Sequence, residues 1–167
     1  MINIFFGFWK KFSIVLLAIV VLYCYASLPE SIAITHDSQG KPIRFIDKQV
    51  YFYVASAVGF LFNLLMTLLG NQLQKAEFSK IFPNSEWAQK PLALRELLRG
   101  WQSAFVAIIN TFLIFAILGL NNINAGKNQT LDFNYNWMLL LGGALLMILI
   151  FVVPLRLLFS TPRNIED

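Results

Sequence analysis

The sequence predicts an all-α integral membrane protein whose four transmembrane helices form an antiparallel bundle, and three observations predict this class. Hydrophobic residues make up 57% of the 167-residue chain. Charged residues make up 13%, against about 25% in ordinary soluble domains. The apolar residues also gather in four stretches, which cover residues 12–28, 50–70, 101–120 and 137–159. Since about 20 apolar residues cross a hydrocarbon core about 30 Å thick, we expect one four-span domain over residues 1–167.

The first apolar stretch follows Lys10 and Lys11, as the core of a signal peptide would. However, it is longer than the roughly 7–15 apolar residues of such a core. The basic pair is itself preceded by the apolar segment 2–9, whose aromatic side chains suit a membrane interface. We therefore expect a retained first span, which Pro29 ends because proline interrupts helical hydrogen bonding.

The segment between the first two spans has two interpretations. Residues 31–35 alternate polar or small residues with isoleucine, and Ile43 and Phe45 continue the alternation after a turn signal at 37–40. This pattern favours a short β-hairpin on the membrane surface. An irregular loop is the alternative that the pattern leaves open.

Small residues within the spans mark places where two helices can approach closely. Ser56 and Gly59 occupy such positions in the second span, and Gly142 and Gly143 occupy them in the last span. We expect the bundle to pack through these two pairs.

Two asparagines lie inside the predicted spans, Asn63 in the second and Asn110 in the third. Thr67 shares a helical face with Asn63, since the two are four residues apart. Antiparallel helices bring both amides to a similar depth, and an amide that faced lipid would be costly. We expect a hydrogen bond between the two helices, with a polar binding site around the pair as the alternative.

The two remaining connections differ in character. In the segment before the third span, Pro91 suits the first turn of a helix. Residues 92–101 have a roughly helical spacing of apolar side chains, so this segment either lies at the interface or continues into the third span. The asparagine-rich segment 121–136 is expected to be a loop.

Basic residues predict the orientation, since short cytoplasmic loops carry an excess of Lys and Arg. If the N-terminus is cytoplasmic, that side holds nine of the 13 basic residues: Lys10, Lys11, Lys75, Lys80, Lys90, Arg95, Arg99, Arg156 and Arg163. The opposite side holds Lys41, Arg44, Lys48 and Lys127. We therefore expect both termini to be cytoplasmic. Because topology explains the basic excess, it does not call for a nucleic-acid partner.

Catalytic motifs are missing from the sequence. It has no glycine-rich phosphate loop, no nucleophile elbow and no Cys/His cluster with metal spacing. Cys24 and His36 are each the single residue of their type. No acidic residue lies in the middle of a predicted span, so a carboxylate proton relay is not supported. We therefore expect no enzymatic activity, no metal and no cofactor.

A set of short motifs lies around the first outer segment. They are Leu28-Pro29-Glu30, Thr35-His36-Asp37, Gly40-Lys41-Pro42 and Asp47-Lys48, with Phe82-Pro83-Asn84 in the next connection. In these motifs the chain resembles the small bacterial membrane domain, of unknown function, that begins the SdpI-type toxin-immunity proteins. The family often has an acidic residue soon after the Gly-x-Pro proline, where this chain has Ile43 and Arg44.

The resemblance implies a four-span fold and an outer-loop motif made of Pro29, His36, Asp37, Gly40 and Pro42. Together with the spans it leads to three functional expectations. The first is a non-catalytic accessory subunit of a larger complex in a bacterial inner membrane, with membrane lipids and other integral membrane proteins as partners. The second is an SdpI-like protein of immunity or envelope-stress sensing. The third is a small transporter with Asn63, Thr67 and Asn110 along a polar path.

Overall fold

The computed structural model describes residues 2–81, 85–131 and 136–162. Six helices and two strands follow one another along this part of the chain. They are α1 (Ile2–Ser27), β1 (Ser31–His36), β2 (Pro42–Asp47), α2 (Lys48–Lys75), α3 (Phe78–Ile81), α4 (Glu86–Gln89), α5 (Pro91–Ala125) and α6 (Asn136–Phe159).

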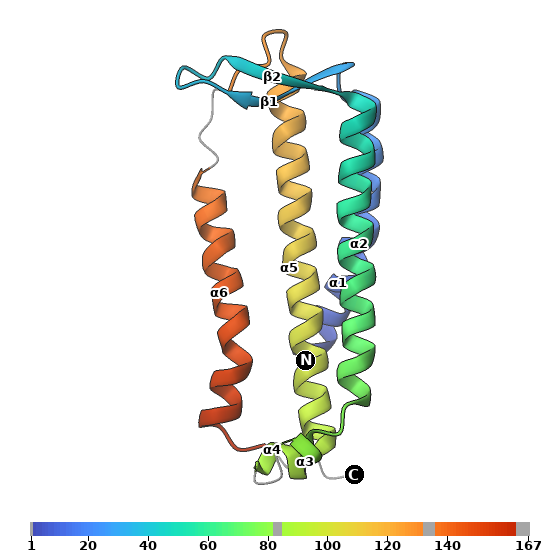
Figure 1. Ribbon diagram of the computed structural model, residues 1–167, viewed down its shortest axis with the longest axis vertical. Coiled ribbons are helices and arrows are strands. Elements are labelled where there is room, and N and C mark those ends of the chain that lie inside the picture. The colour runs from blue at the N-terminus through green and yellow to red at the C-terminus, as the bar shows by residue number, and fades with distance from the viewer. Residues whose placement is uncertain (1, 82–84, 132–135, 163–167) are drawn as a thin grey trace.

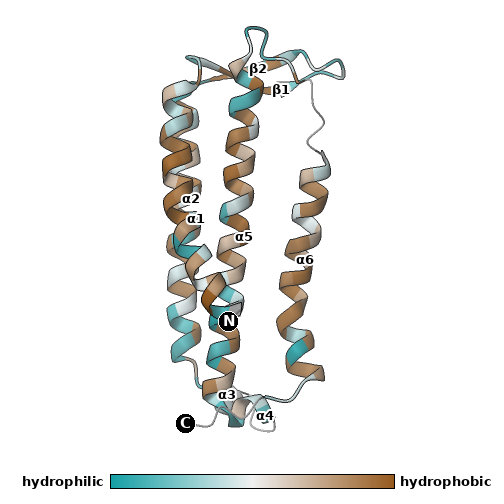
Figure 2. Ribbon diagram, turned by 180° about the vertical axis from the view of Figure 1, so that it is seen from behind, coloured by the Kyte–Doolittle hydropathy of each residue, from teal (hydrophilic) through white to brown (hydrophobic). Residues whose placement is uncertain are grey.

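The four long helices lie side by side and alternate in direction along the chain (Figure 1). The hairpin of β1 and β2 covers one end of the molecule, called the hairpin end below, and the short helices α3 and α4 lie at the opposite end. Each long helix is long and apolar enough to cross a membrane. Hydrophobic residues extend along most of their length (Figure 2). The fold is therefore an antiparallel set of four helices, each long and apolar enough to span a membrane, with a small two-stranded sheet added to it.

The helices are longer than the apolar stretches that predicted them. α1 begins at Ile2, so the aromatic segment 2–9 is part of the first helix. α5 begins at Pro91, which shows that residues 92–101 continue into the third span. At its other end α5 continues to Ala125, so residues 121–125 are helical and the loop expected at 121–136 begins later. With 35 residues, α5 is about 50 Å long and exceeds a hydrocarbon core about 30 Å thick.

The core of the bundle lies where α1, α2 and α5 meet near the hairpin end. Its fully buried side chains include Cys24 of α1 and Ile32 of β1. Ile114 and Ile117 of α5 complete the cluster. The strand thus closes the top of the same apolar core that the spans form.

The outer segment forms the hairpin, which resolves the choice between a hairpin and an irregular loop. β1 and β2 pair antiparallel, from Ser31 opposite Asp47 to His36 opposite Pro42. Ile32 and Ala33 have no exposed surface, whereas most of β2 is exposed. The hairpin therefore lies over the helix ends, with Ile32 and Ala33 of β1 buried against the bundle.

Helix α6 stands apart from α1 and α2 and has its main contacts with α5 (Figure 1). Two tryptophans attach it in the half that faces the α3–α4 end. The indole N–H of Trp87 donates to the Ser160 carbonyl at 2.7 Å, and that of Trp101 donates to the Leu149 carbonyl at 2.7 Å. Around them Leu94, Leu98 and Val153 form a second apolar cluster.

Candidate functional site

Asn63 and Asn110 face each other between α2 and α5. Each side-chain amide donates to the other's carbonyl oxygen at 3.0 Å. Asn110 also donates to the hydroxyl of Ser13 at 3.3 Å, and all of Asn110 and Ser13 is buried. The second N–H of Asn63 reaches the Gly59 carbonyl at 2.8 Å. The amides are therefore paired within one network that joins α1, α2 and α5.

Thr67 lies apart from this network, although it shares a face with Asn63. Its hydroxyl donates to the Asn63 backbone carbonyl at 2.8 Å, and its side chain is exposed. Such a bond within one helix satisfies the hydroxyl locally. Thr67 therefore contributes no contact from α2 to α5 in this network.

The two predicted pairs of small residues, one in α2 and one in α6, differ in what they contact. A Cβ at Gly59 would lie 3.1 Å from Leu17 of α1, and Ser56 is half-buried one turn away. A Cβ at Gly142 would lie 3.0 Å from the Phe112 ring of α5, so α6 approaches α5 there. At Gly143 a Cβ would meet no heavy atom within 4 Å. The expectation that Gly143 packs within the bundle is therefore wrong, because it faces away from α5.

The residues of the outer-loop motif form the ends and the turn of the hairpin. Pro29 links α1 to β1, and Pro42 begins β2. Asp37 organises the turn, since its carboxylate accepts the backbone N–H groups of Gln39 and Lys41, each at 2.8 Å. Gly40 has a φ of 76°, a conformation that favours glycine.

A second connection holds this hairpin from the side. A ring nitrogen of His36 lies 2.9 Å from the Gln129 carbonyl oxygen, and the Gln129 side chain donates to the Ser31 carbonyl at 2.8 Å. The Leu131 backbone N–H donates to the Gly40 carbonyl at 2.9 Å. The hairpin and the 126–131 loop thus form one connected surface at the hairpin end.

Asn124, which sequence reasoning assigned to a loop, connects this surface to the bundle. It is buried in α5, accepts the Ala33 N–H at 2.7 Å and donates to the Ala33 carbonyl at 3.1 Å. A backbone group without a partner at this buried site would be costly. A spacing of two heptads from Asn110 was the signal for this role, since it places both amides on nearly the same helical face.

Gln102 is a further intramembrane contact that the sequence did not reveal. Its side chain is buried and donates to the Met66 carbonyl of α2 at 2.5 Å. A Cβ at Gly70 would clash with the Gln102 side-chain amide. Gly70 therefore makes room for a second polar contact between α2 and α5.

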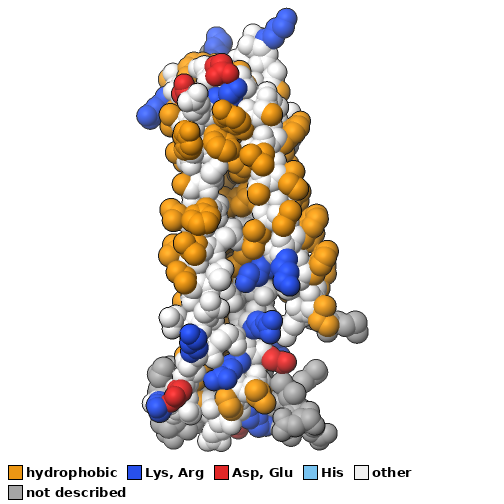
Figure 3. Space-filling view, turned by 90° about the vertical axis from the view of Figure 1, so that its right-hand side faces the viewer, with side chains coloured by type: hydrophobic (Ala, Val, Ile, Leu, Met, Phe, Trp, Pro, Cys, Tyr) orange, Lys and Arg blue, Asp and Glu red, His pale blue; other side chains and the backbone are white. Residues whose placement is uncertain are grey.

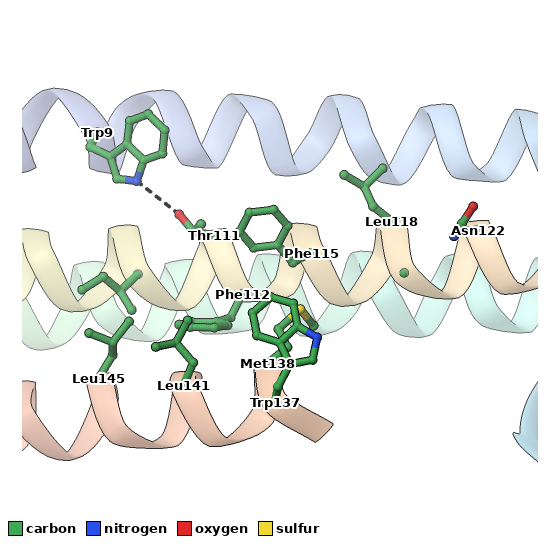
Figure 4. A pocket seen from close by; sticks show the side chains of 12 residues that line it. Trp9, Thr111, Phe112, Phe115, Leu118, Asn122, Trp137, Met138, Leu141 and Leu145 are labelled. Carbon is green, nitrogen blue, oxygen red and sulfur yellow. Dashed lines mark hydrogen bonds between the residues drawn. The ribbon is translucent and has the colours of Figure 1, made fainter. Parts of the chain in front are cut away.

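An apolar cavity of about 550 Å³ lies beside α5, bounded by α6 and by Trp9 of α1 (Figure 4). Phe112 and Phe115 of α5 face Trp137 and Leu141 of α6 across it. At its edge the Trp9 indole donates to the Thr111 hydroxyl at 3.1 Å. The cavity suits an apolar chain, and its size lies within the range of about 300–1,000 Å³ for ligand pockets.

Among the described residues no group of three or more His, Cys, Asp and Glu side chains could hold a metal ion. Phe82-Pro83-Asn84 and Arg163, which entered the resemblance and the charge count, lie outside the described residues. Comparisons of the chain with protein families, with curated proteins and with solved structures found no match.

Proposed function

We propose that the chain is a non-catalytic membrane protein that acts by binding other integral membrane proteins, as an accessory subunit of a larger complex in a bacterial inner membrane. The observation that carries the proposal is the open outer face of α6. In the most apolar windows of both α6 and α2 11% of residues are buried, against 39% in α5. Lipid can cover such a face, so exposure alone does not indicate a partner.

The position of Gly143 makes this face suitable for a second helix. A Cβ there meets open space, and Ala144, Met147 and Ile148 beside it are exposed. Since helices associate in lipid through close backbone approach at small residues, an exposed glycine in mid-span offers such an approach. The polar groups deeper in the bundle support the same proposal, because Asn63 and Asn110 are satisfied by each other rather than open to a substrate.

Gentle extraction from the native membrane tests the proposal. We expect a stoichiometric set of larger membrane proteins to co-purify with the wild type and to be lost with Gly143→Leu, whose side chain would block the approach. Gly7→Leu is the matched control, since Gly7 is also a helical glycine with open space around its Cβ position. A protein that runs as a strict monomer and cross-links to nothing would contradict the proposal.

The basic residues support an orientation for this assembly. Lys10, Lys11, Lys75 and Arg156 lie in the halves of their helices that face the α3–α4 end, and Lys41 and Lys127 lie at the hairpin end. The excess of basic residues on the first side supports a cytoplasmic α3–α4 end with both termini on that side. The hairpin would then face outward from the cytoplasm.

The ordered hairpin favours a second candidate, SdpI-like immunity or envelope-stress sensing. Glu30 and Lys48, which belong to the motifs shared with that family, form an ion pair of 2.7 Å at the base of the hairpin. Asn124 ties the hairpin to α5, so a peptide that displaced the hairpin would also disturb the central helix. Unchanged sensitivity of a deletion strain to envelope-active peptides would remove this candidate.

A further inference from the structure

A second cavity, of about 800 Å³, lies between the halves of α1, α2 and α5 that face the α3–α4 end. We call it the basic pocket, because Lys10, Lys11 and Arg99 line it. Amide side chains add hydrogen-bond donors to its wall, from Asn3, Asn71 and Gln74. The three helices thus bring three cations and several polar groups to one hollow.

The positive charge in this pocket exceeds its negative charge. Glu96 is the one carboxylate among the residues that line it. Within the described part of the chain, the ion pairs are Lys48–Glu30 and Lys80–Glu77, and both lie elsewhere. Lys10 and Arg99 instead repel each other. Three cations that the fold holds beside a single carboxylate favour an anion between them.

The pocket also has free volume beside its cations. A Cβ at Gly7, one turn before Lys10 and Lys11, would meet no heavy atom within 4 Å. At Gly100 a Cβ would clash with the side-chain amide oxygen of Asn3. A glycine at position 100 therefore allows the amide of Asn3 to lie against α5, and one at position 7 leaves the pocket open.

The depth of the pocket indicates where its anion comes from. Its cations directly precede the apolar stretches that begin at residues 12 and 101, and Asn71 directly follows the stretch that ends at residue 70. On the face that includes α2, Lys and Arg side chains lie at both ends of a broad hydrophobic band, and one group of them lies in the lower half, below the band (Figure 3). The pocket therefore lies where the apolar spans end, at the level of lipid headgroups.

We infer that the basic pocket binds the phosphate group of an anionic lipid headgroup. Arg99 suits this role because a guanidinium can bind two phosphate oxygens at once, and the two lysines add compact charges. Basic pockets between transmembrane helices bind such headgroups by the same chemistry. A soluble phosphate compound has the same group, so the test must separate the two sources.

Native mass spectrometry of the purified full-length protein tests the inference. We expect phosphatidylglycerol to bind more tightly than phosphatidylcholine, and Lys10→Gln/Arg99→Gln to weaken its apparent Kd about 30-fold, which corresponds to about fivefold for each basic residue. Gly7→Leu should also weaken binding, because it fills the pocket and keeps every charge. Thermal unfolding in phosphatidylcholine would verify that both variants fold.

Two matched controls complete the design. Lys41→Gln/Lys127→Gln makes the same change in net charge at the hairpin end, and Gly143→Leu makes the same substitution at an open glycine of α6. Both should bind phosphatidylglycerol as the wild type does. Equal loss of binding in all four variants, or in none, would overturn the inference. Pocket-dependent binding of inorganic phosphate, without preference for phosphatidylglycerol, would overturn the inference that the bound phosphate group belongs to a lipid.

Discussion

At the residue scale, the amides inside the spans act as packing contacts because each finds a partner on a neighbouring helix. Asn63 pairs with Asn110, and Gln102 pairs with the Met66 carbonyl. The bilayer core has no water that could form hydrogen bonds with such groups, so an unpaired amide would raise the free energy of the folded state. These contacts therefore determine which faces of α2 and α5 meet.

Substitution of the asparagine pair measures this contact. Asn63→Leu and Asn110→Leu should each destabilise the bundle by about 1–2 kcal/mol, because each leaves a polar group without its partner. The double variant should lose less than the sum of the two, with a coupling of about 1 kcal/mol. Thermal unfolding in micelles gives these values, and strict additivity would show that the pair contributes nothing.

The same double variant bears on the transporter hypothesis. If Asn63 and Asn110 line a polar path, replacing both with leucine should abolish transport in reconstituted vesicles. Transport that persists in the double variant would remove that hypothesis.

At the element scale, the hairpin is held by contacts from the 126–131 loop and from α5. Gly40 lies at its tightest point, where an added Cβ would be 2.6 Å from the backbone oxygen of Leu131. The backbone there has a positive φ, which a side chain also disfavours. The turn and the loop can therefore meet only at a glycine.

Gly40→Ala should destabilise the surface that the hairpin and the 126–131 loop form by about 1–3 kcal/mol, through backbone strain and the clash with Leu131. Hydrogen exchange should show faster exchange for amides of β1 and of the 126–131 loop, with the long helices unaffected. Gly126→Ala, in the 126–131 loop, is the matched control, since the φ of Gly126 is −76° and a Cβ there meets open space. Equal exchange in the two variants would disprove this account of Gly40.

At the scale of the whole molecule, the structure is a three-helix unit of α1, α2 and α5 with α6 attached to one side of α5. This arrangement leaves one cavity beside α6 and the basic pocket on the other side of the bundle. A protein partner at α6 and a lipid in the basic pocket would therefore occupy different surfaces. The two proposals can fail independently.

Cysteine labelling tests the proposed orientation of the whole chain. On a Cys24→Ser background, Lys41→Cys at the hairpin end should react with a membrane-impermeant maleimide in spheroplasts. Lys75→Cys, at the other end of α2, should react only after the membrane is opened. Both positions are exposed, so burial would not explain a difference between them. The reverse labelling pattern would show that the hairpin end is cytoplasmic and would contradict the proposed orientation.

The sequence by itself determined the four spans, because apolar length is a local property that a bilayer selects directly. It also indicated the turn at Asp37 and Gly40, whose preferences are local too. The tertiary structure decided the partners. Asn124 and Gln102 became contacts between elements, Gly142 packed on α5 and Gly143 faced outward. Those outcomes depend on helix rotation and on chain segments far apart in sequence, so periodicity along one helix does not determine them.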